Sequence, residues 1–366
     1  MTIEPFDPRD MTPEALAARV EALGVAPAAG RRLLAAILGR GVFDPAAWGR
    51  DHQVPRRLGD RVGELPRLSL EDSVVSEVDG FQKLLFRTHD GLAVETVLIP
   101  LHKPGAVSVC LSTQVGCAMA CAFCATARMP SRRNLKTWEI VDQWQQAREV
   151  ARSQGRRVTG AVFMGMGEPF LNYDRALAAA ELLRCPWGGS LSAKAITIST
   201  VGLVPEIDRF TAENRRFRLS ISLGAATDQA RARLVPVASR TPVAEVMAAA
   251  RRHSLARKER VMLSYVCIGG ENVDEADARA LGALIGDTPV RLDLIDVTDP
   301  SGRFRPPTAG EMSIFRDALT RHLGQPVVRR YSGGADIRAA CGTLAGTTVF
   351  GDLVAQAPGA ARGHAE

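Results

Sequence analysis

Three cysteines lie within eight residues of the sequence, at Cys117, Cys121 and Cys124. They follow an apolar run, residues 106–111, that is typical of a buried strand. A closed zinc site takes four protein ligands, and a 4Fe–4S cluster normally binds four cysteines. With only three thiolates nearby, one iron stays open for an outside ligand, such as the amino and carboxylate groups of S-adenosylmethionine (SAM). The alternative is that three small, weakly polar residues share a loop by chance.

The composition indicates a protein without membrane spans. The chain has 366 residues, of which 46% are hydrophobic and 23% charged, enough for one large α/β domain and a smaller appendage. No run approaches the roughly 18 apolar residues of a membrane span, and the N-terminus lacks the apolar segment of a secretory signal. We therefore expect a cytoplasmic protein with no membrane partner. Its seven cysteines favour metal binding or catalysis over a disulfide framework.

The charge balance favours a polyanionic partner such as RNA. The formal net charge is +6 and the isoelectric point about 9.1, and arginine carries nearly all of the excess. An arginine-rich proteome would give the same excess without that meaning. The paired arginines are candidate phosphate contacts, although most such pairs belong to a solvated surface; they are Arg132, Arg133, Arg156, Arg157, Arg215, Arg216, Arg251, Arg252, Arg329 and Arg330.

The chain before the cysteines divides into two parts. Residues 1–75 predict a small helical domain, with one helix starting at Thr12-Pro13-Glu14 and a second over 31–38. Its arginines suit an RNA-binding accessory domain, and a solvated helix face would look the same. Residues 76–105 predict a β-hairpin extension, because Asp90-Gly91 separates runs that alternate with period two.

The rest of the chain alternates strands with helices. This pattern predicts a parallel sheet with helices outside. The expected strands cover 106–111, 161–164, 195–199, 218–223, 261–267 and 290–297, and the helices 138–153, 174–184, 203–212, 228–252, 274–286 and 309–323. Six strands are too few for a closed eight-stranded barrel. We expect a partial (β/α)6 barrel over 106–330, a segment with Cys341 over 331–350, and a disordered tail over 351–366.

Glycines and small polar residues follow successive predicted strands. In a parallel α/β barrel the carboxyl ends of the strands form the ligand site. Glycines let a ligand approach the backbone, and a carboxylate or hydroxyl there can receive the amino or ribose groups of SAM. The predicted SAM-binding residues at these ends are Gly167, Glu168, Ser199, Ser222, Leu223 and Gly224.

Several motifs together resemble one family, the RlmN/Cfr-type radical-SAM RNA adenine methyltransferases. The resemblance runs from about residue 94 to residue 345. Its motifs occupy 94–97, 110–117, 133–135, 164–169, 199–202 and 336–342. It implies a radical-SAM barrel with one 4Fe–4S cluster per chain, held by Cys117, Cys121 and Cys124, and two SAM molecules consumed per turnover.

The resemblance also implies a mechanism that uses two further cysteines. One SAM methylates Cys341, and a radical made from the second removes a hydrogen from that methyl group. The resulting carbon radical adds to an adenine carbon, with C2 favoured and C8 as the alternative. Cys110 then attacks the sulfur of Cys341, which releases the product and leaves a transient disulfide. Glu95 acts as a base or holds the edge of the adenine.

The partners implied by the resemblance are RNA and a reductant. The RNA is 23S ribosomal RNA, with tRNA as the second candidate, and the electron donor is a protein such as flavodoxin or ferredoxin. We expect a monomer. Without the family, Cys110 would be read as a small buried hydrophobe, and Glu95 as the outward face of a hairpin. Cys185 and Cys267 match no motif, and we interpret both as structural.

The sequence departs from the family pattern at several positions. Ala127 and Pro130 replace glycines, Gly224 replaces a histidine, and Thr343 replaces a glutamine. Residues 296–298 replace Pro-x-Asn, so that Thr298 stands where a SAM-contacting amide is expected. One alternative is therefore a diverged radical-SAM enzyme that acts on a substrate other than RNA. A second alternative is a non-catalytic iron–sulfur RNA-binding protein, which would have no use for Cys110 and Cys341.

Overall fold

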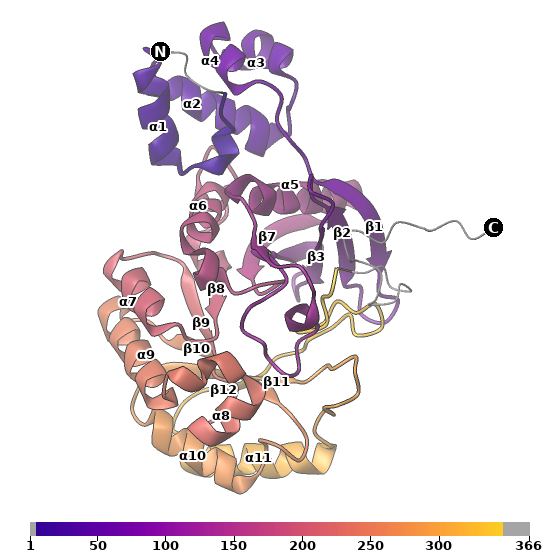
Figure 1. Cartoon of the computed structure of the whole chain (residues 1–366), viewed down its shortest axis with the longest axis vertical. Coiled ribbons are helices and arrows are strands. Elements are labelled where there is room, and N and C mark those ends of the chain that lie inside the picture. The colour runs from indigo at the N-terminus through magenta and orange to yellow at the C-terminus, as the bar shows by residue number, and fades with distance from the viewer. Residues whose placement is uncertain (1–4, 347–366) are drawn as a thin grey trace, which may run out of the picture.

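A ten-stranded mixed sheet forms the centre of the molecule within residues 5–346, the part described by this computed structural model. The strands lie in the order β1-β2-β3-β4-β7-β8-β9-β10-β11-β12 (Figure 1). The sheet has free edges at β1 and β12, so it curves without closing. This is the predicted partial barrel.

The parallel part of the sheet has one strand more than predicted. The expected strands are β4 (Ala106–Cys110), β7 (Arg157–Phe163), β8 (Ile196–Thr200), β9 (Arg218–Ser222), β10 (Val261–Cys267) and β11 (Val290–Asp296). Strand β12 (Val327–Arg329) pairs in parallel with β11. The sequence analysis missed it because three residues are too few to show a periodic pattern.

The antiparallel extension packs edge to edge with the barrel. Its strands are β1 (Ser69–Val75), β2 (Gln82–Arg87) and β3 (Ala93–Pro100), and β3 pairs antiparallel with β4. The predicted turn at 90–91 joins β2 to β3. Strand β1 occupies the end of the stretch predicted as helical, because the change to a period of two begins before residue 76.

The N-terminal part contains more helix than predicted. Its helices are α1 (Pro13–Ala22), α2 (Pro27–Leu34), continued by a π-helical turn (Ala35–Gly39), α3 (Pro45–His52) and α4 (Arg56–Val62). Thr12 caps α1 by accepting a hydrogen bond from the Ala15 amide. Helices α3 and α4 have eight and seven residues, too short for a clear amphipathic pattern.

Buried polar contacts fix these helices on α5 (Thr137–Ser153), which lies between them and the sheet (Figure 1). The guanidinium of Arg9 is fully buried, 3.3 Å from the Asp142 carboxylate on α5. On the same helix, Gln145 Nε2 donates to the Ile37 carbonyl at 2.9 Å. Because such groups are costly to bury without partners, the helical part is bound to α5 in a specific orientation.

The remaining helices follow the prediction with one correction. They are α6 (Tyr173–Arg184), α7 (Val204–Ala212), α8 (Asp228–Leu234), α9 (Val243–Arg257), α10 (Glu275–Ile285) and α11 (Ala309–His322). The single helix expected over 228–252 is wrong. Pro236 and Pro242 interrupt it, since proline lacks the amide hydrogen that a continuous helix needs, and the structure has α8 and α9 with a short 3₁₀ turn between them. No helix of the described chain is long and apolar enough to cross a membrane.

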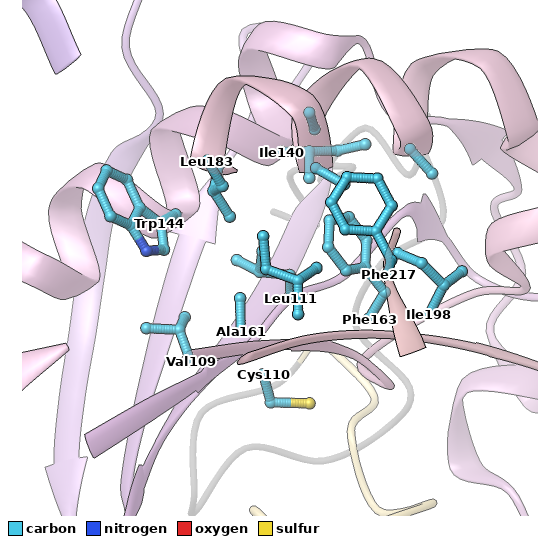
Figure 2. Packing of buried hydrophobic residues seen from close by; sticks show 14 of the residues in the cluster. Val109, Cys110, Leu111, Ile140, Trp144, Ala161, Phe163, Leu183, Ile198 and Phe217 are labelled. Carbon is cyan, nitrogen blue, oxygen red and sulfur yellow. The ribbon is translucent and has the colours of Figure 1, made fainter. Parts of the chain in front are cut away.

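One large hydrophobic core lies between the sheet and its outer helices. Leu111 and Phe163 from the strands pack toward Ile140 and Trp144 of α5 (Figure 2). Cys110 points to the other side of β4, with its sulfur away from this core (Figure 2). The alternation of a strand therefore places the Cys110 thiol on the inner face of the barrel.

Candidate active site

A cavity of about 220 Å³ opens at the carboxyl ends of the parallel strands. It brings together most of the predicted site residues from widely separated parts of the chain. They are Cys110, Cys117, Cys121, Cys124, Gly167, Glu168, Ser199, Ser222, Gly224, Thr298 and Cys341. Leu223 and Glu95 are not among the residues that line it.

The three loop cysteines are free thiols at one end of this cavity. Among the described residues, three donor atoms come within 4.8 Å of one another only at His89, Asp90 and Glu139, so the three cysteine sulfurs are spread more widely. Sulfurs around one zinc ion, at about 2.3 Å from it, would lie closer together than that. The three cysteine sulfurs are therefore not gathered around a single ion.

The surroundings of these thiols disfavour the thiolate form. Burial raises the pKa of Cys117 to about 12, and burial raises the pKa of Cys121 well above its ordinary value. Neighbouring loop cysteines add to both shifts. Buried thiols of this kind stay protonated unless a strongly positive centre takes the place of the protons, as bound metal does.

Gly167 lies where the chain must come close to another backbone. Its φ of +98° is unfavourable for residues with a side chain, and a Cβ there would lie 2.5 Å from the Gln114 side chain. The next residue, Glu168, is buried. Its Oε1 accepts the Phe170 amide at 3.0 Å, and its Oε2 accepts the Val201 amide at 2.8 Å. Glu168 thus links the ends of β7 and β8, and burial raises its pKa to about 7.

A buried arginine, missed in the sequence, holds two of the strand ends together. Arg231 is 1% exposed. Its Nε donates to the Leu223 carbonyl at 3.0 Å, and its Nη2 donates to the Val201 carbonyl at 2.5 Å. Leu223 therefore contributes a backbone position behind the cavity. A buried arginine in a polar helix gives no signal in sequence, because its partners are carbonyls of remote loops.

Gly224 occupies the position where the family has histidine. Its φ is +76°, and a Cβ there would lie 3.1 Å from the Val235 side chain. A larger side chain would be strained in this backbone. The loss of histidine is therefore accompanied by a local conformation that suits glycine.

Cys110 and Cys341 face the same cavity. Cys110 is buried and Cys341 is exposed. Burial raises the pKa of Cys110 to about 12, the neighbouring Cys341 thiol contributes to the increase, and the Arg330 guanidinium opposes it. All seven cysteines are free thiols here, so the predicted transient disulfide between these two stays a prediction.

Residues 331–346, which we call the strap, carry Cys341 across the cavity. The Ser332 hydroxyl accepts the Cys341 amide at 2.9 Å. Two bonds then join the strap to the short helix after the cysteine loop. The Ala125 amide donates to the Gly342 carbonyl at 2.7 Å, and Thr126 Oγ1 donates to the Leu344 carbonyl at 2.6 Å. In Figure 1 this yellow segment passes beside the cysteine loop and the extension.

Glu95 lies deeper, on β3, and is fully buried. Its Oε1 is 2.9 Å from Lys83 Nζ. Its Oε2 accepts the amides of Ala345 and Gly346, at 2.7 and 2.9 Å. The carboxylate thus contacts the strap, and the catalytic role predicted from the sequence stays a prediction.

Three further cavity residues were missed as site residues. Tyr331 is 69% exposed, and its hydroxyl donates to Asp79 Oδ2 at 2.8 Å. Arg330 Nη1 donates to Met164 Sδ at 3.4 Å. Asp296 Oδ1 is buried and has no hydrogen-bond partner in the described part of the chain. Two of these residues had a signal in the sequence: Asp296 departs from the family pattern, and Arg330 belongs to a pair of arginines.

Other predicted features lie away from the cavity. Cys185 and Cys267 are buried and do not line it. Several of the paired arginines form salt bridges with nearby carboxylates, among them Arg133 with Asp90 and Arg251 with Asp287. Thr343 is buried and donates to the Ala340 carbonyl at 2.8 Å, where it stabilises the turn after Cys341. The predicted disordered tail lies outside the described residues.

Comparisons with known proteins match this geometry. The Radical SAM superfamily model matches residues 111–281. A "Probable RNA methyltransferase" of Myxococcus xanthus is 44% identical and covers 96% of this chain and 98% of its own length. A "Probable dual-specificity RNA methyltransferase RlmN" of Heliobacterium modesticaldum is 38% identical over 94% of this chain and 90% of its own length.

A solved structure shares the fold. The radical SAM methyltransferase from Sphaerobacter thermophilus superposes with a TM-score of 0.84 at 36% identity, and the match covers 94% of this chain and all of that one. The family implies a 4Fe–4S cluster and SAM, and the cysteine loop and cavity fit both. Since the relatives match over nearly the whole chain, this protein belongs to the RlmN-type family of radical-SAM RNA methyltransferases.

Proposed function

We propose that this enzyme methylates an adenine carbon of RNA through S-methylcysteine at Cys341, with C2 as the favoured carbon. One observation carries the proposal: Cys341 and Cys110 line the same cavity as the three-cysteine loop. A scaffold protein would have no need to direct two further thiols toward a cluster site.

The chain supplies two thiols with different surroundings. When bound, the cluster and SAM supply hydrogen-atom abstraction, which activates a methyl group that ordinary polar transfer would not deliver to an adenine carbon. Cys341, exposed on the strap, accepts the methyl group from the first SAM. Cys110, buried on β4, later attacks the Cys341 sulfur. A sulfur–sulfur bond then forms, and the bond between Cys341 and the product breaks.

The mouth of the cavity has groups that suit a nucleotide. The hydroxyl bond to Asp79 fixes Tyr331 while 69% of the residue stays exposed. Aromatic rings exposed in this way can stack on bases. Arg330 lies beside it in the cavity lining and can contact phosphate. Together with the net charge of +6, these groups support an RNA substrate in the cytoplasm, with 23S ribosomal RNA as the first candidate and tRNA as the second.

A second candidate function is the same radical chemistry on another substrate. The observation that favours it is the altered cavity wall, where Asp296 replaces proline and Gly224 replaces histidine. The buried Asp296 Oδ1 offers an acceptor with no partner among the described residues. A ligand with one additional donor would satisfy it, and such a ligand need not be the family's usual nucleotide.

The test begins with anaerobic reconstitution of the cluster, followed by mass analysis of the peptide that contains Cys341. We expect a methyl group on Cys341 that carries deuterium when methyl-deuterated SAM is supplied, and that is absent in Cys117→Ala. RNA transcripts are then assayed for methyladenine. An unmodified Cys341 in a protein that still cleaves SAM would contradict the methyl relay. A methylated Cys341 with no RNA product would favour the second candidate.

A further inference from the structure

Glu95 and Lys83 form a charged pair inside the antiparallel extension. Lys83 on β2 and Glu95 on β3 are diagonal neighbours, since Lys83 pairs with Val97 and Glu95 pairs with Leu85. Their side chains are 3% and 0% exposed, and the charged atoms lie 2.9 Å apart. Burying two charges costs several kcal/mol for each ion unless the geometry is good and further hydrogen bonds are made. The pair therefore needs additional partners.

The strap supplies those partners. The amides of Ala345 and Gly346 both donate to Glu95 Oε2, at 2.7 and 2.9 Å. A carboxylate oxygen that accepts two backbone amides makes strong, charge-assisted hydrogen bonds, and Lys83 forms an ion pair with the other oxygen. These two residues follow Cys341 by only four and five positions. At no more than about 3.6 Å per residue, this anchor keeps Cys341 within about 14 Å of it.

The orientation of the carboxylate does not suit proton transfer. A general base must lie within about 2.6–3.2 Å of the proton that it removes, or act through one water. Glu95 does not line the cavity, and its two oxygens face Lys83 and the strap amides.

We propose that Glu95, together with Lys83, is a positioning residue: a buried latch that fixes the strap so that Cys341 stays between Cys110 and the cysteine loop. This inference rests on the proposed function and replaces the role of Glu95 as a base. According to this proposal, the antiparallel extension holds the strap that contains the methylated cysteine. The strap bonds at Gly342 and Leu344 attach to the short helix after the cysteine loop, whereas the latch, like the bonds to Asp79, attaches to the antiparallel extension.

The test compares two double variants that differ only in the hydrogen-bond acceptor. Both remove the charge pair, so that neither leaves a buried ion. Lys83→Met with Glu95→Gln keeps an oxygen for the two amides, whereas Lys83→Met with Glu95→Leu removes it. Hydrogen exchange of the peptide over 339–346, the methyl content of Cys341 and the methyladenine in RNA are measured for each.

We expect the glutamine variant to protect the 345 and 346 amides as the wild type does, and to methylate RNA within about tenfold of the wild-type rate, less than the loss expected of a missing base. The leucine variant should lose that protection and reduce the rate of Cys341 methylation about a hundredfold, as a misplaced reacting group does. A glutamine variant that keeps protection and Cys341 methylation but loses RNA methylation a hundredfold or more, the effect of a missing general base, would overturn the proposal. So would a leucine variant that keeps full protection.

These readouts separate the latch from the proposed function. Hydrogen exchange reports the strap without any RNA, and Cys341 methylation reports the thiol position without a nucleotide. If wild-type protein methylates Cys341 but no RNA, the proposed substrate fails while the exchange comparison still tests the latch.

Discussion

The cysteine loop and the strap carry the thiols of one cavity, but they are positioned in different ways. The loop's cysteines lie within eight residues and begin seven positions after the last residue of the core strand β4. The strap lies more than 200 residues later and is held by contacts with three remote parts of the chain, at Asp79, Glu95 and Thr126. The loop therefore depends mainly on local sequence, whereas the strap depends on the tertiary fold.

This difference follows from the tasks of the two segments: the loop binds a cluster, whereas the strap holds a thiol that reacts. A ligand set can be built from a short segment, because the cluster itself orders its ligands. A reacting thiol must instead meet several partners in turn, and a misplacement of about 1 Å can cost a hundredfold in rate. The strap accordingly has hydrogen bonds on both sides of Cys341.

The largest expected effects come from removing one thiol of the cysteine loop or the reacting thiol of the strap. Cys117→Ala should lose cluster iron, SAM cleavage and RNA methylation, since the loop then offers too few ligands. Cys341→Ala should keep the iron and lose all RNA methylation, because no residue carries the methyl group. Iron analysis, deoxyadenosine production and RNA mass spectrometry measure the three properties. Methylated RNA from Cys341→Ala would break the division of roles between loop and strap.

Gly167→Ala tests how closely the strand ends are packed on the loop side. The new Cβ would meet Gln114 at 2.5 Å in a backbone with φ of +98°, so we expect a loss of about 3 kcal/mol in unfolding free energy and weaker SAM binding. Denaturant unfolding and SAM titration measure both. Gly224→Ala is the matched control, with a milder contact of 3.1 Å. Equal losses in the two variants would show that the close approach at Gly167 is not special.

Glu168, in the cavity beside the cysteine loop, should make the stability of the folded protein depend on pH. Burial raises its pKa from 4.5 to about 7, so between these values the folded protein binds more protons than the unfolded chain. Stability should then fall as the pH rises from about 4.5 to about 7, by about 3 kcal/mol for this group. Glu168→Gln should remove that fall. Unfolding of the cluster-free protein at pH 5 and pH 8 measures it, and an identical pH slope in both proteins would contradict the prediction.

The smallest effect, a change in RNA affinity, is expected at Tyr331, the exposed aromatic residue of the strap. Tyr331→Ala should weaken RNA binding about tenfold, in line with the loss of one base stack. Tyr331→Phe keeps the ring and should bind nearly as well, although it loses the bond to Asp79. Cys341 methylation should be unchanged in both, since that step involves no RNA. Equal affinities for the alanine variant and the wild type would remove Tyr331 from the RNA-binding surface.

Features that depend on short-range pattern could be predicted from the amino-acid sequence. The spacing of Cys117, Cys121 and Cys124 predicted the ligand loop, and the alternation of strands with helices predicted the partial barrel. The rule that ligand sites form at the carboxyl ends of parallel strands placed Glu168 and Ser199 in one cavity, and both line it. These inferences need only local periodicity and topology.

Contacts between groups that are remote in the sequence could not be predicted and depend on the folded chain. Glu95 could be read from sequence as a base, but its partners are Lys83 on the next strand and amides some 250 residues away. Arg231 likewise bonds to carbonyls of two separate loops. Hydrogen bonds to backbone atoms leave no mark in the identity of the partner residue. Which polar group holds which part of the strap follows from packing, and packing is settled when the whole chain has folded.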